Sequence, residues 1–431
     1  MKYPSLLLGA ALAVLPFVAA VNAADEPLTA VANEDAHYQL PATDDGLPGT
    51  GPIRRYDWFK KLWYEKRSAW AKNVQKDQGA LVFLGDSITQ GWWDVGNVFA
   101  GVKIANRGIS GDTTRGVLIR LKEDVLDLKP KGIVLLIGTN DLEEKAKPET
   151  IAGNLKLLLE GFKKHDPAMP VVLCSVFPSS DTKNRPHGAI QKINELYRDV
   201  AEEFPQVTLL DTWSLFANAQ GDAKPEEMPD LLHPNFFGYG KWANALRPIL
   251  ETLNLVPTWP DDFKPEAGFT SLFNGRDLTG WGYEDGPTFD KKISSSDGRY
   301  LAKDGRLIVT VSKKQRDYRA LWTTRKYPKD FVLKFEFRAS PGADSGVYIR
   351  KPQLQIRDYP VIGPFAALKN YRSSDWNEVA VTVSDGLAHA TCNGEVLVDA
   401  FPVPETGPIG IESDRGQVEY RRIRLGEKTL W

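Results

Sequence analysis

The first half of the chain alternates between short, continuous apolar runs and longer segments in which apolar residues recur at helical spacing. The runs predict strands over residues 81–84, 102–105, 132–137, 170–177 and 207–210, and the periodic segments predict helices over residues 56–74, 113–128, 148–165, 188–204 and 238–253. Fully apolar strands separated by helices are typical of a parallel sheet that is covered on both faces. The pattern therefore predicts an α/β domain over residues 53–255.

From residue 268 onward, apolar and polar positions alternate with a period of two. Segments of this kind cover residues 306–311, 331–337, 378–383 and 422–425, and Asp-Gly and Asn-Gly turns separate them. No long helical pattern interrupts this part of the sequence. We therefore expect an all-β sandwich over residues 268–431, joined to the first domain by a proline-rich linker over residues 256–267.

The N-terminus has a separate character. Lys2 precedes an apolar run over residues 6–21, and Val21-Asn22-Ala23 places small residues at the positions that a signal peptidase reads. The run is short for a membrane anchor, so residues 1–23 are predicted to be a secretory signal peptide. Residues 24–52, rich in Pro, Gly and Asp, are predicted to be a leader or linker. We expect an exported protein, periplasmic or extracellular, with no stable membrane span after signal removal.

Composition narrows the function classes. The 431 residues carry a net charge of −2 with acidic and basic residues interspersed, so no basic block indicates a nucleic-acid partner. The two cysteines, Cys174 and Cys392, are far apart, and the five histidines show no metal-ligand spacing. The sequence therefore predicts neither a metal site nor a cofactor, and it leaves the oligomeric state open.

Two motifs carry the side chains of a nucleophile and a base. Ser87, in Gly85-Asp86-Ser87, follows a predicted strand directly and would project from the carboxyl edge of the sheet, where open α/β folds bind ligands. Asp230 stands three residues before His233, a spacing that lets a carboxylate hold one ring nitrogen while the other takes a proton. Taken singly, Ser87 is also a suitable helix N-cap, and His233 a suitable surface residue.

Two further loops are expected at the same edge. Gly111 lies in the loop after the second predicted strand, and Asn140 follows the third. A glycine there lets its backbone N–H approach a substrate oxygen, and an asparagine there can direct its amide to the same point. Ordinary turn chemistry is the alternative for each residue. The order Ser, Gly, Asn, Asp/His along one edge favours a single site.

The stretches that carry these motifs resemble the SGNH hydrolase (GDSL-type esterase) family. They are FLGDSITQGWW, NRGISGDTTRGVLIRL, VLLIGTND and LLHPNFFGYGKWANALRPIL. Within this family they resemble the acetylhydrolase branch related to platelet-activating-factor acetylhydrolase Ib catalytic subunits. The resemblance implies a flavodoxin-like sheet of strand order 2-1-3-4-5. It also implies that Ser87 is the nucleophile, His233 the base and Asp230 its orienting partner. The implied oxyanion hole comprises the backbone N–H groups of Ser87 and Gly111 and the Asn140 side chain.

Several stretches of the second domain resemble the 3-keto-disaccharide hydrolase domain family. They are GFTSLFNGRDLTGW, DSGVYIR, LQIRDY and GPIGIESDRGQVEYRRIRL. This resemblance implies a concanavalin A/laminin-G-like jelly roll. Four residues of these stretches either line a concave sugar site or face solvent on a sandwich: Tyr348, Arg350, Gln355 and Glu412. A carbohydrate-binding role is expected for this domain.

Trp92 and Trp93 follow the nucleophile and either line a substrate pocket or belong to the core. Together these patterns predict an exported serine esterase that removes acetyl or other short acyl groups, on carbohydrate, through a Ser-His-Asp triad and an acyl-enzyme. Three alternatives stay open. They are a lysophospholipase or general acylesterase with a docking sandwich, a bifunctional esterase and keto-glycoside hydrolase, and a non-catalytic glycan-binding protein.

Overall fold

The computed structural model describes residues 36–431 except 312–318, 329, 361–367, 413 and 428–431. The predicted signal peptide, residues 1–23, and residues 24–35 of the predicted leader lie outside the described residues. Within the described ranges, no helix combines the length and apolar character needed to cross a bilayer.

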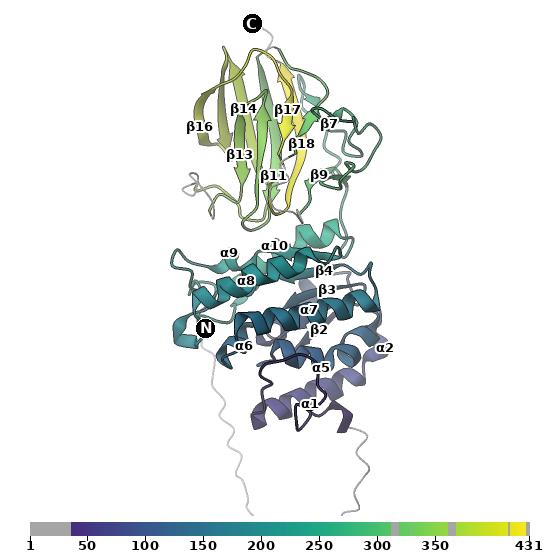
Figure 1. The fold of residues 1–431 in the computed structure, drawn as a ribbon. Helices are drawn as coiled ribbons and strands as arrows, with labels where there is room; N and C mark the ends of the chain where they lie inside the picture. The colour runs from purple at the N-terminus through teal and green to yellow at the C-terminus, as the bar shows by residue number, and fades with distance from the viewer. Residues whose placement is uncertain (1–35, 312–318, 329, 361–367, 413, 428–431) are drawn as a thin grey trace, which may run out of the picture. The chain divides into compact units, whose positions relative to one another are not determined.

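The first domain is built on a five-stranded parallel sheet with the order β2-β1-β3-β4-β5, which confirms the predicted flavodoxin-like topology. Its strands (Figure 1) are β1 (Leu81–Gly85), β2 (Ile104–Gly108), β3 (Gly132–Leu136), β4 (Val171–Cys174) and β5 (Val207–Leu210). Alternate residues of β1 enter different cores: Leu81 and Phe83 pack into one, Val82 and Leu84 into the other. Burial on both faces is why the strand sequences are apolar throughout.

Helices cover both faces of this sheet. The core on one face receives buried residues of α5 (Thr114–Asp124), α7 (Pro148–His165) and α8 (His187–Glu202). The core on the other face receives those of α10 (Phe236–Thr252). The shorter helices are η1 (Ala36–Tyr38), α2 (Val74–Asp77), α3 (Ser87–Gln90), α4 (Val95–Val98), η2 (Leu126–Leu128), α6 (Thr139–Glu143), η3 (Asp181–Lys183) and α9 (Thr212–Phe216), and α1 (Asp57–Ala71) precedes the sheet.

Part of the predicted leader is bound to this domain. The backbone N–H and carbonyl of Thr50 both pair with the Asn154 side chain on α7, at 3.0 and 2.8 Å. The hydroxyl of Thr113, which caps α5, donates to the carbonyl oxygen of Pro52 at 3.0 Å. Residues 50–52 therefore lie along two helices of the domain, fixed by hydrogen bonds to both.

The second domain is an antiparallel sandwich, as predicted. One sheet has the order β13-β12-β17-β10-β7, and the other runs β16-β15-β14-β11-β18-β9-β8 with β6 paired to β18. The strands (Figure 1) are β6 (Thr270–Ser271), β7 (Trp281–Tyr283), β8 (Tyr300–Lys303), β9 (Arg306–Val309), β10 (Leu321–Thr323), β11 (Phe331–Ala339), β12 (Asp344–Ile349), β13 (Gln353–Arg357), β14 (Asn377–Ser384), β15 (Leu387–Cys392), β16 (Glu395–Pro402), β17 (Ile409–Ile411) and β18 (Val418–Glu427). Alternate buried residues of the two sheets form one core, as in Phe331, Leu333 and Phe335 of β11.

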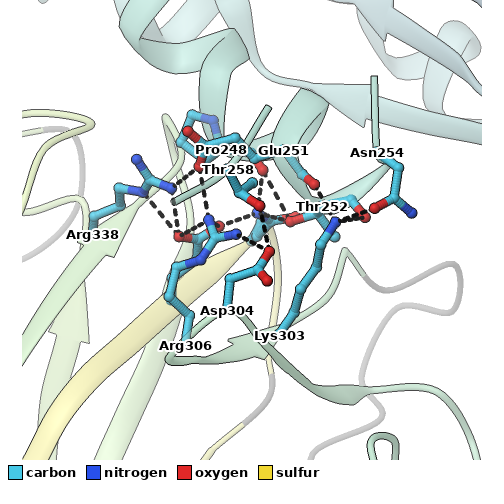
Figure 2. Close-up of polar contacts among 11 residues, drawn as sticks. Pro248, Glu251, Thr252, Asn254, Thr258, Lys303, Asp304, Arg306 and Arg338 are labelled. Atoms are coloured by element: carbon cyan, nitrogen blue, oxygen red, sulfur yellow. Dashed lines mark hydrogen bonds and ion pairs between the residues drawn. The ribbon is translucent and has the colours of Figure 1, made fainter. Parts of the chain in front are cut away.

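Charged residues join the end of α10 to the sandwich (Figure 2). Glu251, in the last turn of α10, accepts hydrogen bonds from Arg306 at 2.7 Å and from Arg338 at 2.6 Å. Arg338 also pairs with Glu419 of β18 at 2.7 Å. Lys303 donates to the carbonyl oxygen of Thr252 at 3.2 Å, so a cation lies at the C-terminus of the helix, where the helix dipole favours it.

Candidate active site

Ser87 lies where strand β1 passes into helix α3. The Asp86 side chain caps this helix by accepting from the backbone N–H of Ile88 at 3.0 Å. The turn is tight at Gly85, where a Cβ would lie 2.3 Å from both the Leu136 carbonyl oxygen and the Thr89 hydroxyl. Helix α3 is only one turn long. Its contribution at Ser87 is therefore local backbone N–H groups more than a large helix dipole.

A compact turn before α10 carries the Asp–His pair. One carboxylate oxygen of Asp230 accepts from the backbone N–H groups of Leu232 and His233, at 3.1 and 2.7 Å. Leu231, which lies between Asp230 and Leu232, has a left-handed φ of 60°. The other carboxylate oxygen lies 2.7 Å from Nδ1 of His233. A single side chain thus fixes both the backbone of the turn and the plane of the imidazole.

The imidazole bridges the carboxylate and the serine. Nε2 of His233 lies 2.9 Å from Oγ of Ser87, on the side opposite the contact with Asp230. Burial alone would raise the pKa of Asp230, but the backbone N–H and the ring of His233 outweigh it and lower that pKa. A carboxylate that stays ionised favours the tautomer with the proton on Nδ1, which leaves Nε2 as an acceptor for the serine proton.

Gly111 lies in the loop after β2 with φ +86°, a conformation that glycine adopts freely. A Cβ at this position would lie 2.6 Å from Cη2 of Trp58 and 3.0 Å from Nη1 of Arg54. Arg54 and the first turn of α1 therefore pack directly on this glycine.

Asn140 lies in α6 and is buried. Its Nδ2 donates to the carbonyl oxygen of Asp112 at 3.0 Å, in the loop that also holds Gly111. Its Oδ1 accepts from Nη2 of Arg185 at 2.9 Å. Both loops that the sequence assigned to one edge are thus linked through this amide.

Arg185, Glu143 and Arg54 form an ionic group around Asn140 that sequence reasoning missed. Arg185 pairs with Glu143 at 2.7 Å, and Glu143 also pairs with Arg54. Burial would raise the pKa of Glu143, but the two guanidinium groups outweigh it and lower that pKa. In a sequence, isolated charged residues outside regular patterns are interpreted as surface residues. No local sequence pattern therefore predicted this ionic group.

Three carboxyl groups, each next in sequence to Ser87, Gly111 or Asn140, are buried. Burial raises the pKa of Asp86 and of Asp112 to about 6, and that of Asp141 to about 7. Asp112 pairs with the buried Arg120 at 2.8 Å. Asp141 accepts from the backbone N–H and the hydroxyl of Thr114, at 3.0 and 2.5 Å. Asp112 and Asp141 thus tie the loops of the edge to α5.

The two tryptophans after the nucleophile have different environments. Trp92 is 1% exposed and packs against Trp242 with ring centroids 4.6 Å apart, so it belongs to the core and does not line an open pocket. Trp93 is 83% exposed. Tyr56 and Trp58 form an exposed aromatic pair that stacks with ring planes 11° apart, and Trp58 lies beside Gly111.

On the sandwich, three of the four predicted sugar-site residues share one face. Tyr348 donates to Glu412 at 3.0 Å and packs against Trp322 of β10, with ring centroids 4.9 Å apart and ring planes tilted by 31°. Gln355 donates to Asp344 at 2.7 Å. The sheet face that these residues occupy therefore combines aromatic rings with carboxylate and amide groups.

Arg350 does not belong to this face. Alternation along a strand would place it with Tyr348, but β12 ends at Ile349 and Arg350 has a left-handed φ of 65°. Its side chain is buried, donates to the Pro404 carbonyl oxygen at 2.7 Å and lies over the Phe331 ring. The turn thus redirects this residue into a structural role.

In the described residues, no cluster of three or more His, Cys, Asp and Glu side chains is arranged to hold a metal ion. The two thiols are buried, and burial raises the pKa of Cys174 and of Cys392 to about 12. Neither is therefore a reactive thiolate at neutral pH.

Comparison with known proteins assigns both domains. Residues 83–241 match the GDSL-like lipase/acylhydrolase family, and residues 268–426 match the 3-keto-alpha-glucoside-1,2-lyase-like domain. The human platelet-activating factor acetylhydrolase IB subunit alpha2 is 29% identical over 207 residues, 46% of this chain and 87% of that protein. The alpha1 subunit of Rattus norvegicus is 28% identical over 195 residues, 44% of this chain and 82% of that protein. A GDSL-like lipase from Bacteroides thetaiotaomicron is 26% identical with a TM-score of 0.39, covering 44% of this chain and 97% of its own. The chain therefore carries a GDSL-like lipase/acylhydrolase domain over residues 83–241, which supports a serine ester hydrolase, and a 3-keto-alpha-glucoside-1,2-lyase-like domain over residues 268–426.

Proposed function

We propose that this protein is an exported serine esterase that removes acetyl or other short acyl groups from carbohydrate. The observation that carries the proposal is the continuous contact Asp230–His233–Ser87, with distances of 2.7 and 2.9 Å at the two sides of one imidazole. A hydroxyl in this setting is activated by the neighbouring base.

The proposed reaction has two steps. His233 takes the Ser87 proton as Oγ forms a bond to the ester carbonyl carbon, and the oxyanion binds the backbone N–H groups of Ser87 and Gly111 and Nδ2 of Asn140. Collapse of this intermediate breaks the ester C–O bond, and the alcohol leaves with the proton from His233. Water then attacks the acyl-enzyme by the same route, which releases the acid and restores Ser87.

The choice of acyl group and alcohol rests on different observations. The relatives with the same domain are named acetylhydrolases, which favours a short acyl group. The second domain matches a family named for a glucoside, which favours a carbohydrate alcohol. On the sandwich we assign sugar binding to the face of Tyr348, Gln355 and Glu412, because aromatic rings beside carboxylate and amide groups suit sugar rings and hydroxyls.

We also infer the division of the chain that the sequence predicts. Residues 1–23 direct export and are removed, and residues 24–52 lead into an esterase domain over residues 53–255. Residues 256–267 connect it to the sandwich over residues 268–431. Export to the periplasm or beyond would bring the enzyme to acylated glycans outside the cytoplasm.

Hydrolysis of p-nitrophenyl esters of rising chain length, beside acetylated xylan and pectin oligomers, tests this proposal. We expect activity on acetyl esters and on at least one acetylated glycan, lost in Ser87→Ala and His233→Ala. A preference for long-chain esters or lysophospholipids would contradict the carbohydrate assignment and indicate a lipid substrate. Absence of hydrolysis with every ester would leave a glycan-binding protein without enzymatic activity.

The sandwich is tested in the full-length Ser87→Ala protein, which keeps both domains. Calorimetric titration with acetylated xylo-oligosaccharide is expected to show binding that Tyr348→Ala weakens. A second activity, cleavage of a 3-keto-disaccharide, is favoured by the family that residues 268–426 match. Release of monosaccharide from that substrate by the Ser87→Ala protein would establish it independently of the esterase.

A further inference from the structure

The amide of Asn140 is held from two opposite sides. Its Oδ1 accepts from Nη2 of Arg185 at 2.9 Å, and its Nδ2 donates to the Asp112 carbonyl oxygen at 3.0 Å. A guanidinium offers only donors and a carbonyl only acceptors. The reverse orientation would place N–H against N–H at Arg185 and oxygen against oxygen at Asp112. The two contacts therefore select a single orientation of the amide.

Arg185 is itself fixed by several contacts. Its Nε donates to the Thr139 carbonyl oxygen at 3.1 Å, and its Nη1 donates to the Lys183 carbonyl oxygen at 2.6 Å. Its Nη2 also pairs with Glu143 at 2.7 Å. The side chain is 3% exposed. A planar fork held at every nitrogen has little freedom to move away from Asn140.

The charge of Arg185 is balanced within the same group. Glu143 pairs with both Arg185 and Arg54, and Arg54 also pairs with Glu144 at 2.7 Å. Arg54 in turn lies beside Gly111, within 3.0 Å of the position that a Cβ would take there. The ionic group thus extends from one proposed oxyanion donor to the other.

We propose that Arg185 is a positioning residue for ester hydrolysis. It holds the Asn140 amide so that one N–H of Nδ2 binds Asp112 and the other is presented to the substrate oxygen. This inference rests on the proposed function, because it requires that Asn140 stabilise an oxyanion. Arg185 touches no reacting atom and acts only through Asn140.

The test is a double-mutant cycle with p-nitrophenyl acetate as substrate. Since removing one oxyanion donor costs about a hundredfold or more in kcat, we expect a loss of that order in Asn140→Ala. Arg185→Met is expected to lower kcat by roughly tenfold or more with little change in KM, because the interaction it supports forms in the transition state. In the Asn140→Ala background, Arg185→Met should cause no further loss beyond about twofold.

Two further variants separate positioning from folding. Arg185→Lys keeps the charge opposite Glu143 but not the planar fork, and an intermediate kcat is expected. Arg67→Met removes an equally buried arginine, paired with Asp124 at 2.9 Å, and should leave kcat within about twofold of wild type. Thermal unfolding of each variant shows whether it is folded at the assay temperature.

The outcomes distinguish this inference from the proposed function. If Asn140→Ala hydrolyses the ester at the wild-type rate, the oxyanion assignment fails and the role of Arg185 fails with it. If Asn140→Ala is slow but Arg185→Met is not, or if the two losses multiply, the esterase proposal stands and Arg185 is only structural. The role of Arg185 also fails if Arg185→Lys retains the full wild-type kcat.

Discussion

At Gly111 the backbone, an aromatic ring and a guanidinium meet within contact distance. An alanine there would carry its Cβ against Trp58 and Arg54 at 2.6 and 3.0 Å, and its φ of +86° would be strained as well. We expect Gly111→Ala to lower the free energy of unfolding by about 1–3 kcal/mol and to reduce kcat, because strain of this order must be relieved by moving the loop. Urea unfolding and ester hydrolysis measure the two effects.

Gly153 is the matched control for this change. It lies on the exposed side of α7, and a Cβ there would have no neighbour within 4 Å. Gly153→Ala should stabilise the protein by roughly 0.5–1 kcal/mol, the usual difference between these residues inside a helix. A stable, fully active Gly111→Ala protein would contradict the tight packing at this loop.

The buried carboxyl of Asp141 gives a prediction for pH. Burial raises its folded-state pKa to about 7, well above the ordinary value of 3.8. Between those values the folded protein keeps a proton that the unfolded chain has lost, so this group makes unfolding easier as pH rises from about 4 to 7. The Asp141→Asn protein has no carboxyl group at this position, so this contribution to the pH dependence is absent.

The prediction is read from urea unfolding at pH 4.5, 5.5 and 7. Relative to wild type, the Asp141→Asn protein should gain stability as pH rises through this range. Asp127→Asn, which removes a solvent-exposed carboxylate paired with Lys122 at 2.9 Å, should follow the wild-type pH dependence. Parallel curves for the Asp141→Asn and wild-type proteins would mean that Asp141 is ionised throughout.

Residues of the site differ in how far the sequence can identify them. Ser87 directly follows a strand, and Asp230 and His233 belong to one turn, so short motifs specify their local geometry. Arg185 contacts Asn140 across 45 positions, and Arg54 contacts Glu144 across 90. Such long-range pairs depend on the packing of α6 against distant segments. A single sequence contains no pattern that reports this packing.

Elements were predicted well where the pattern of apolar residues continues through the whole element. Helix α7 (Pro148–His165) and strand β5 (Val207–Leu210) have the predicted bounds. The one-turn helix α6 was missed, because five residues are too few to show helical periodicity. Strand β2 begins and ends later than predicted; it lies at the sheet edge and includes the polar pair Asn106-Arg107.

The bound leader segment yields a prediction at the level of elements. Asn154 is buried on α7, where it pairs with both backbone groups of Thr50 and donates to Thr114 at 2.9 Å. Asn154→Ala would leave these groups without their partner. We expect a loss of about 1–3 kcal/mol in unfolding free energy and faster proteolytic cleavage near residue 50, because unsatisfied buried polar groups cost this much.

Limited proteolysis with mass spectrometry of the fragments measures the second effect. Asn73→Ala removes an asparagine whose contact, with the Ala69 carbonyl oxygen at 2.9 Å, is exposed to solvent. It should leave both stability and cleavage pattern near those of wild type. Unchanged cleavage around residue 50 in Asn154→Ala would show that the segment is held by other contacts.

For the molecule as a whole, α10 links the candidate active site to the sandwich. Its N-cap, Asn235, lies two residues after His233, and Glu251 lies in its last turn. Seventeen helical residues span about 25 Å at 1.5 Å each. The sandwich contacts the far end of this helix, where Gln417 donates to the Pro248 carbonyl oxygen at 3.2 Å. The helix that begins just after the turn of Asp230 and His233 is therefore stabilised by the second domain.

The charges at this contact decide how firmly the domains hold together. Glu419 is fully buried and faces Arg306 and Arg338, which also pair with Glu251, so two carboxylates balance two guanidinium groups. Arg338→Met would leave Glu419 buried beside a single arginine, and breaking a buried pair in this way typically costs about 3–5 kcal/mol. We expect a loss of that size in urea unfolding. Arg325→Met, which removes an exposed pair with Glu427, should cost less than about 1 kcal/mol. Equal losses in the two variants would mean that water enters this contact and screens its charges.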